Sequence, residues 1–219
     1  MNRITALPAV RHLARRSLLG LAGLALAAVA LGLPRPAHAA DESPDMLVKS
    51  VSEDVLAAIR ADASLRSGDV RRIMALVDAK VMPSVNFEVM TRSAVGPQWR
   101  AATPEQRTKL QTEFKTLLLR VYSGALTQIK DQTVEVTRTQ PVQGSTQVVV
   151  QSEVRGKGEP IKLDYRMDKF NEAWKIIDVN VGGIWLVQSY RSQFGQVLSS
   201  GGIDALISRL VEQNKAGKS

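Results

Sequence analysis

The sequence predicts an α+β fold in which several helices cover one face of a curved antiparallel β-sheet. Apolar residues recur at helical spacing over residues 44–62 and again over 103–129, whereas residues 147–181 largely alternate apolar and polar side chains, as strands do. The connections between the predicted strands are short, and short connections join antiparallel neighbours because parallel strands need long crossovers. Helices packed on one face of such a sheet make an α+β domain.

The first 39 residues have the features of a cleaved secretory signal peptide. A basic segment with three arginines precedes an uncharged apolar run over residues 18–33. This run is shorter than the ~20 apolar residues that cross a membrane, and residues 37–39 read Ala-His-Ala, which suits signal peptidase. We therefore predict cleavage after Ala39 and a single mature domain over residues 40–219. An uncleaved anchor is the alternative, and the paired arginines leave the Sec and twin-arginine routes both open.

Removal of this segment changes both the charge and the available chemistry. The whole chain has 29 basic and 21 acidic residues, a formal net charge of +8, but residues 1–39 hold five arginines and no acidic residue, so the mature chain is only +3. Nucleic acid is therefore not a predicted partner. The only histidines, His12 and His38, lie in the removed segment, and the chain has no cysteine. We predict no catalytic residue, no metal site and no cofactor.

Three helices are predicted in the first part of the mature chain, over about 44–62, 69–82 and 86–96. Ser43 is placed to cap the first helix, which has a proline in its first turn. Asn86 is placed to cap the third in the same way. Each segment carries apolar residues at helical spacing, so each helix has one face to bury.

The clearest helix begins after Thr103 and extends to about residue 129. Thr103 is its N-cap, Pro104 occupies the first turn, and Gln106 completes a capping box. The apolar stripe of this helix consists of Leu110, Phe114, Leu117, Leu118, Val121, Tyr122, Ala125 and Ile129. Because the stripe is wide and long, the helix must lie along another apolar surface.

Four strands are predicted after this helix. The first begins near Val134, and the others cover about 147–154, 161–167 and 174–181, with turns between them that contain glycine or asparagine. The alternation changes phase at residues 176–177, which predicts a β-bulge and therefore a curved sheet.

Two further helices are predicted at the C-terminal end. Gly182-Gly183 ends the last strand, and a helix over 184–198 follows it. A second glycine pair at 201–202 separates that helix from a terminal amphipathic helix. The space between a curved sheet and the helices that cover it is either filled by side chains or holds a ligand.

Motifs for catalysis are missing from the sequence. It has no Gly-x-Gly-x-x-Gly, no Walker sequence and no Gly-x-Ser-x-Gly. Asp164, Asp168 and Asp178 are interpreted as solvated or locally hydrogen-bonded carboxylates. An enzyme that uses Asp178 with Tyr165 inside a pocket is one alternative, and a periplasmic chaperone or adaptor that uses an apolar surface is another.

Several segments of the chain, in order, resemble the MlaC family, also called the toluene-tolerance family, of soluble phospholipid carriers in the Mla pathway. They are LVDAKVMP at 76–83, FEVMTR at 87–92, WRAATPEQ at 99–106, residues 113–126, WKIIDV at 174–179, YRSQF at 190–194 and GIDALI at 202–207. The resemblance spans essentially the whole mature chain.

The resemblance implies a fold related to nuclear transport factor 2 (NTF2-like), with helices and sheet enclosing a deep apolar pocket for the acyl chains of a phospholipid. It implies a non-enzymatic periplasmic carrier that maintains outer-membrane lipid asymmetry. The implied partners are phospholipid, an outer-membrane lipoprotein–porin complex, and an inner-membrane ABC transporter with a ring-forming substrate-binding subunit.

A site of this kind has to enclose its ligand. Two acyl chains of about 15 methylenes each carry on the order of 20 kcal/mol of hydrophobic free energy, which no shallow groove offsets. Apolar side chains on the long helix and on the inward strand faces are the candidate walls, and the alternative is that most of them fill a closed core. The candidate lipid-binding residues are Phe114, Leu118, Tyr122, Val148, Val150, Leu163, Tyr165, Ile176 and Trp185.

Overall fold

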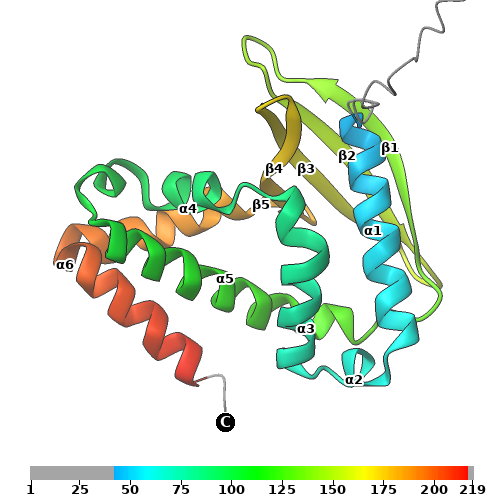
Figure 1. The fold of residues 1–219 in the computed structure, drawn as a ribbon, viewed down its shortest axis with the longest axis horizontal. Coiled ribbons are helices and arrows are strands. Elements are labelled where there is room, and N and C mark those ends of the chain that lie inside the picture. Colours follow the sequence, from blue (N-terminus) through cyan, green and yellow to red (C-terminus); the bar gives the residue numbers. More distant parts are fainter. Residues whose placement is uncertain (1–41, 217–219) are drawn as a thin grey trace, which may run out of the picture. The chain divides into compact units, whose positions relative to one another are not determined.

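One antiparallel sheet, with helices before and after it in the chain, makes up the computed structural model of this protein, which describes residues 42–216 (Figure 1). The predicted cleavage site after Ala39 lies outside the described residues. The helical segments are α1 (Pro44–Ala61), α2 (Ala63–Arg66), α3 (Val70–Leu76), η1 (Val77–Val81), η2 (Met82–Ser84), α4 (Phe87–Val95), η3 (Gly96–Ala101), α5 (Pro104–Leu126) and α6 (Leu186–Ala216).

The predicted starts of α1, α3, α4 and α5 are confirmed, and side-chain caps begin the last three; Ser43 is the N-cap residue of α1, but its side chain forms no capping hydrogen bond. Asp69 Oδ1 accepts the backbone N–H of Arg71 at 2.9 Å, and Asn86 Oδ1 accepts that of Val89 at 3.1 Å. At the start of α5, Thr103 and Gln106 form the predicted capping box. Each bond satisfies an N–H that the first helical turn leaves without a partner.

The five strands lie in the sheet in the order in which they occur in the chain, and each pairs antiparallel with the next. They are β1 (Thr133–Pro141), β2 (Val148–Arg155), β3 (Ile161–Phe170), β4 (Ala173–Val181) and β5 (Ile184–Trp185). The predicted bulge is confirmed: Met167 pairs with Ile176 and Arg166 with Asp178, which leaves Ile177 as the extra residue.

The prediction of a helix from residue 184 is wrong in its first two residues. Gly182 and Gly183 adopt φ values of +57° and +94°, and this two-residue turn sends the chain back along β4. Ile184 and Trp185 consequently pair with the end of β4 as β5, and α6 starts only at Leu186.

The two predicted C-terminal helices follow one another directly, as two halves of α6. They meet at a kink at Gly202, where φ is +70°, a conformation that glycine adopts without steric cost. Between α3 and Pro83 the predicted helix continues, but as the π-helical turn η1.

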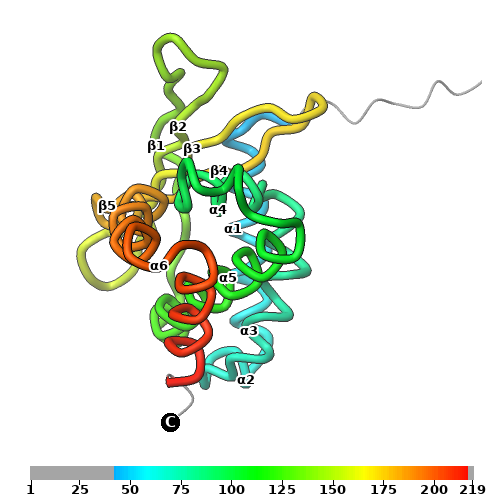
Figure 2. The backbone as a smooth tube through the Cα atoms, turned by 90° about the vertical axis from the view of Figure 1, so that its left-hand side faces the viewer, coloured from blue at the N-terminus to red at the C-terminus, as the bar shows by residue number. Residues whose placement is uncertain are grey.

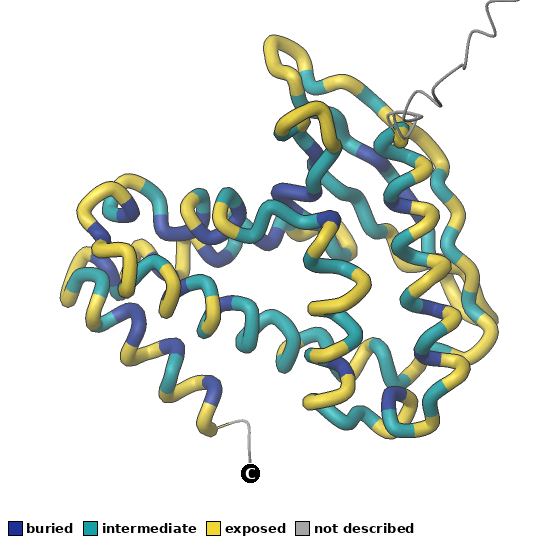
Figure 3. Tube along the Cα trace, viewed as in Figure 1, coloured by how far each residue is buried: buried dark blue, intermediate teal, exposed yellow. Residues whose placement is uncertain are grey.

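Buried side chains form two main groups (Figure 3). The first, here called the helical core, lies among α4, η3, α5 and α6, which pack together beside the β4–β5 end of the sheet (Figures 1 and 2). The second, the sheet core, consists of Val48 of α1 with Val150, Met167 and Ile176 of the sheet. A smaller group joins α1, α2 and α3. The structure thus places α1 against the sheet and the longer helices against one another.

Candidate functional site

An apolar cavity of about 210 Å³ lies between α1, the C-terminal end of α5 and the sheet. Its lining residues come from separate parts of the chain, and only Ser52 and Tyr165 among these residues are polar. The lining residues are Val48, Val51, Ser52, Val55, Leu56, Val81, Leu126, Ile129, Val134, Val154, Leu163, Tyr165 and Ile176. The cavity therefore presents no charged side chain to a ligand.

The space stays open because the side chains facing it are short. Cross-strand partners point to the same face of a sheet, so the pairs Val154–Ile161 and Ser152–Leu163 fix which residues look toward α1. The wall residues are almost all valine, leucine or isoleucine, which do not reach across from the sheet to the helix. A cavity of about 150 Å³ holds one benzene ring, so this one has room for roughly eight carbon atoms.

The Tyr165 hydroxyl is the main polar group within the cavity. It interacts with the hydroxyl of Ser52 on α1 and with that of Ser152 on β2, while Ser152 Oγ donates to the carbonyl of Leu163 at 2.9 Å. Burial raises the pKa of Tyr165, and its two hydroxyl neighbours only partly oppose that rise. The phenol stays neutral and connects the helix wall to the sheet wall.

The structure brings together five of the predicted site residues on the sheet side. Leu163, Tyr165 and Ile176 line the cavity. Val150 is fully buried in the adjoining sheet core, and Val148 packs against that core.

The other four predicted residues lie elsewhere. Phe114 is fully buried in the helical core, with Leu118 and Tyr122 packed against that core. Trp185 pairs with Asn180, which pairs with Asp164, so it lies on the face of the sheet opposite Tyr165.

Sequence reasoning missed the α1 wall of the cavity. Val48, Val51, Val55 and Leu56 all line it from this helix. The only available signal was the apolar stripe of α1, and such a stripe does not distinguish a wall from a filled contact.

Asp178 has a structural role at the junction of β4 and α6. Its side chain is buried, with 7% of the residue exposed, and its Oδ1 accepts the N–H of Val179 at 2.8 Å and that of Val187 at 3.0 Å. Burial raises the pKa of Asp178, against the lowering effect of these bonds and of Arg166. Because Asp178 pairs with Arg166 and Tyr165 with Val179, Asp178 and Tyr165 face opposite sides of the sheet. The two residues required by the enzyme alternative do not share a pocket.

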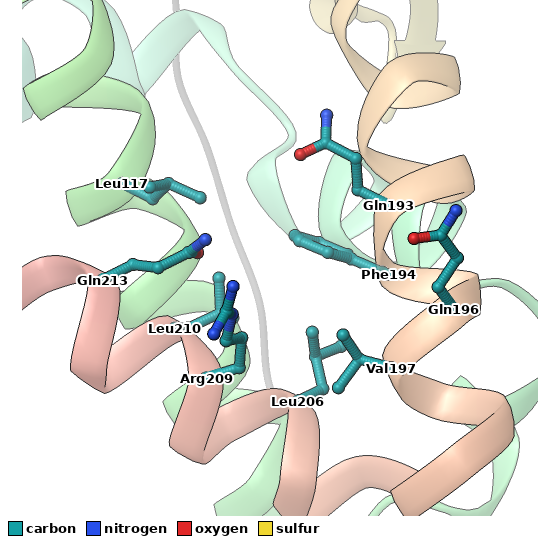
Figure 4. A pocket seen from close by; sticks show the side chains of 9 residues that line it. All are labelled: Leu117, Gln193, Phe194, Gln196, Val197, Leu206, Arg209, Leu210 and Gln213. Carbon is teal, nitrogen blue, oxygen red and sulfur yellow. The ribbon is translucent and has the colours of Figure 1, made fainter.

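A second, more polar pocket of about 180 Å³ lies between α5 and the two halves of α6 (Figure 4). Leu117, Phe194 and Leu206 contribute its apolar walls, and three glutamines and Arg209 also line it. Within residues 42–216, no group of three His, Cys, Asp or Glu side chains is arranged to hold a metal ion. None of the described helices is both long and apolar enough to span a membrane.

These features define a class: an α+β protein whose curved sheet and helices surround an uncharged apolar cavity. The chain belongs to the MlaC family, whose profile, described as MlaC protein, matches residues 49–212. The family resemblance inferred from the sequence motifs is thereby confirmed, as are the α+β class and the antiparallel sheet. The relation to NTF2-like folds stays a prediction.

Relatives and a solved structure agree with this assignment. The chain is 23% identical over 175 residues to the intermembrane phospholipid transport system binding protein MlaC of Haemophilus influenzae, covering 78% of this chain and 82% of that protein. It is also 23% identical over 166 residues to the toluene tolerance protein ttg2D of Pseudomonas putida, covering 75% and 77%. A phospholipid-binding protein from Ralstonia solanacearum, solved in complex with a phospholipid, superposes with a TM-score of 0.76 at 40% identity, covering 80% of this chain and 98% of that one.

Proposed function

We propose that this chain is a periplasmic phospholipid carrier that shuttles phospholipid between the outer and inner membranes and so maintains outer-membrane lipid asymmetry. The observation that carries the proposal is an apolar cavity without a charged wall residue, in a chain 40% identical to a protein solved with a phospholipid bound. Acyl chains require such walls, because every methylene withdrawn from water is worth roughly 0.8 kcal/mol.

The size of the cavity adds a condition to this proposal. Room for roughly eight carbons accommodates only part of one acyl chain. Uptake of a whole phospholipid therefore requires the walls to move apart. α1 is held by apolar packing of Val48 in the sheet core and by two polar contacts: Ser52 interacts with Tyr165, and Asp54 forms a 2.8 Å ion pair with Lys80 of η1.

The finer parts of the proposal follow from the first 39 residues of the sequence, for export, and from the family, for the partners. The chain is exported with a signal peptide cleaved after Ala39, and it exchanges lipid with an outer-membrane lipoprotein–porin complex and with an inner-membrane ABC transporter that has a ring-forming substrate-binding subunit. Exchange is binding and release, so no catalytic group is needed. Leu163, Tyr165 and Ile176 are the proposed direct lipid contacts, with Val148 and Val150 behind them. A lipid contact for Phe114, Leu118, Tyr122 and Trp185 stays a prediction.

Filling the cavity tests the proposal. Val55 lines the cavity from α1, so Val55→Trp places an indole in the space that an acyl chain needs. Displacing only two methylenes forfeits about 1.6 kcal/mol, and we expect bound phospholipid to fall at least about tenfold. Native mass spectrometry of the mature protein, with lipid analysis after organic extraction, measures the amount and kind of bound lipid.

The matched control is Val121→Trp. Val121 is 56% exposed on α5 and does not line the cavity, so this variant should carry as much phospholipid as the wild type, near one molecule per chain. If the wild type stays free of lipid after incubation with vesicles, the carrier proposal fails and a chaperone or adaptor becomes the leading function. If Val55→Trp retains its lipid, the site lies elsewhere, and Leu118→Trp in the helical core is the next variant to compare.

A further inference from the structure

Arg92, Arg100 and Arg191 line a cleft formed by α4, η3 and α6. In Figure 1, α4 and α6 lie on the side of α5 away from α1. The cleft has a volume of about 400 Å³ and lies between the C-terminal end of α4, η3 and α6. It is lined by Arg92, Ser93, Gly96, Pro97, Trp99, Arg100 and Arg191. This cleft shares no lining residue with the apolar cavity, and no carboxylate contributes to its walls.

The positive charge in this cleft is not compensated by neighbouring side chains. Within residues 42–216, the guanidinium groups of Arg92, Arg100 and Arg191 form neither an ion pair nor a hydrogen bond of their own, and Glu88, one turn before Arg92, forms no ion pair either. Five other cations in the described residues do form ion pairs, for example Lys115 with Asp78 at 2.7 Å. Like charges gathered in one cleft repel one another, and a bound anion relieves that repulsion.

Backbone geometry and neighbouring contacts fix the walls of the cleft. Gly96 has φ +75°, and a Cβ atom there would lie 3.6 Å from Nε of Arg191, so this guanidinium rests against the glycine backbone. The Gln98 amide donates to the carbonyl of Leu198 at 3.2 Å, which ties η3 to α6. Arg107 donates a hydrogen bond to the carbonyl of Arg100 at 3.2 Å. The guanidinium carbon of Arg107 lies 5.4 Å from the centroid of the Trp99 indole ring. These contacts hold the backbone of η3 and its neighbouring helices in place around the three arginines of the cleft.

We propose that this cleft binds a phosphate group, and that the phosphate is that of a phospholipid headgroup at an anionic membrane surface. Guanidinium groups present paired N–H donors that match phosphate oxygens. Three guanidinium groups carry a charge of +3, and no carboxylate in the walls of the cleft offsets it. The polar, cationic cleft suits a headgroup, whereas the uncharged, apolar cavity suits acyl carbons. The site goes beyond the proposed carrier function, because it brings the chain to a membrane without using the cavity.

Co-sedimentation with vesicles tests the proposal on the mature protein. The probe is phosphatidylglycerol mixed with phosphatidylcholine, compared with phosphatidylcholine alone at low salt. Each arginine near an anionic membrane contributes about 1 kcal/mol, so the triple variant R92Q/R100Q/R191Q should bind the mixed vesicles roughly 100-fold more weakly. The variant R71Q/R138Q/K157Q removes the same charge from exposed positions outside the cleft, and its binding should change less than about threefold.

A titration with inorganic phosphate separates a headgroup from a free anion. The Gly96 amide resonance, followed by NMR, should shift with added phosphate in the wild type and the control variant and stay unchanged in R92Q/R100Q/R191Q. A phosphate-dependent shift without vesicle binding overturns the membrane assignment in favour of free phosphate. Equal loss of vesicle binding in both triple variants, or no binding of either probe, overturns the site.

The failure of this site and the failure of the carrier function are distinguishable. Val55→Trp should keep its vesicle binding while it loses extractable lipid, because Val55 is not part of the cleft. The arginine variant should lose vesicle binding while it keeps the lipid with which it was purified.

Discussion

The aromatic centre of the helical core and the walls of the apolar cavity are built from similar sequence patterns, yet side chains fill the first and leave a space in the second. In the helical core the Phe114 ring lies 4.9 Å from Tyr190, 5.2 Å from Phe194 and 5.7 Å from Phe87, measured between centroids. The cavity is walled mostly by aliphatic side chains that do not meet across it. Periodicity tells which face of an element is turned inward. The volumes of the facing side chains decide whether that face meets a partner or bounds a space.

The same substitution in the two regions gives the largest expected contrast. Leu110 is fully buried in the helical core, whereas Leu163 lines the cavity. We expect Leu110→Ala to lower the free energy of unfolding by about 2–5 kcal/mol, since it opens a new void in a packed core. Leu163→Ala only enlarges an existing space and should cost about 1 kcal/mol. Urea denaturation of both variants measures the difference, and equal losses would show that the cavity closes in solution.

Asp178 joins the two regions, because it lies on β4 and caps the start of α6. Asp178→Ala leaves the N–H groups of Val179 and Val187 without their acceptor, and we expect a loss of about 1–3 kcal/mol in the free energy of unfolding. Chemical denaturation at pH 7 measures it. A loss below about 0.5 kcal/mol would mean that the cap does not hold α6 on the sheet.

The Asp178→Asn variant tests how ionisation of Asp178 affects stability, when its free energy of unfolding is compared with that of the wild type at several pH values. Burial raises the pKa of Asp178 above its ordinary value of 3.8, so the folded chain holds this proton more tightly than the unfolded chain. The carboxyl therefore favours folding most below pH 3.8, and this contribution is lost as pH rises through the folded pKa. The stability of the wild type relative to Asp178→Asn should fall as pH rises above 3.8, until the carboxyl is ionised in the folded chain as well. A difference that is constant over this range contradicts the assignment.

The smallest expected effect is confined to the start of α5. Thr103→Ala removes one half of the capping box and should cost about 1 kcal/mol in thermal or urea denaturation. Because this cap lies outside the cavity, the amount of bound phospholipid should not change. A parallel loss of lipid would mean that the helical core and the cavity are mechanically coupled.

Features that depend on neighbouring residues in the chain could be predicted from the sequence. The caps at Asn86 and Thr103 and the bulge at Ile177 rest on local hydrogen bonds and on a change of alternation. A two-residue strand has no periodicity to detect, so β5 was missed, although Gly182-Gly183 is a typical hairpin turn.

The candidate site was harder to predict, because it depends on distances between elements. Leu163 and Ile176 line the cavity, while Leu118, from an equally apolar stripe, packs against the helical core. The contribution of α1 was missed for the same reason. No sequence pattern reports how far Val55 lies from the strand opposite to it.

The bulge in β4 also keeps charge away from the face of the sheet that borders the apolar cavity. Before the bulge, Ile176 pairs with Met167 on the face toward α1; after it, Val179 pairs with Tyr165 on that same face. If Ile177 were instead accommodated as a regular strand residue, without a bulge, the even-numbered positions would continue inward, and the Asp178 carboxylate would replace a valine beside the apolar space. One inserted amino acid thus resets the odd–even parity of the strand, so the carboxylate braces α6 from the other face. Deletion of Ile177 would remove the bulge and leave Asp178 and Val179 paired with Arg166 and Tyr165 as they are now.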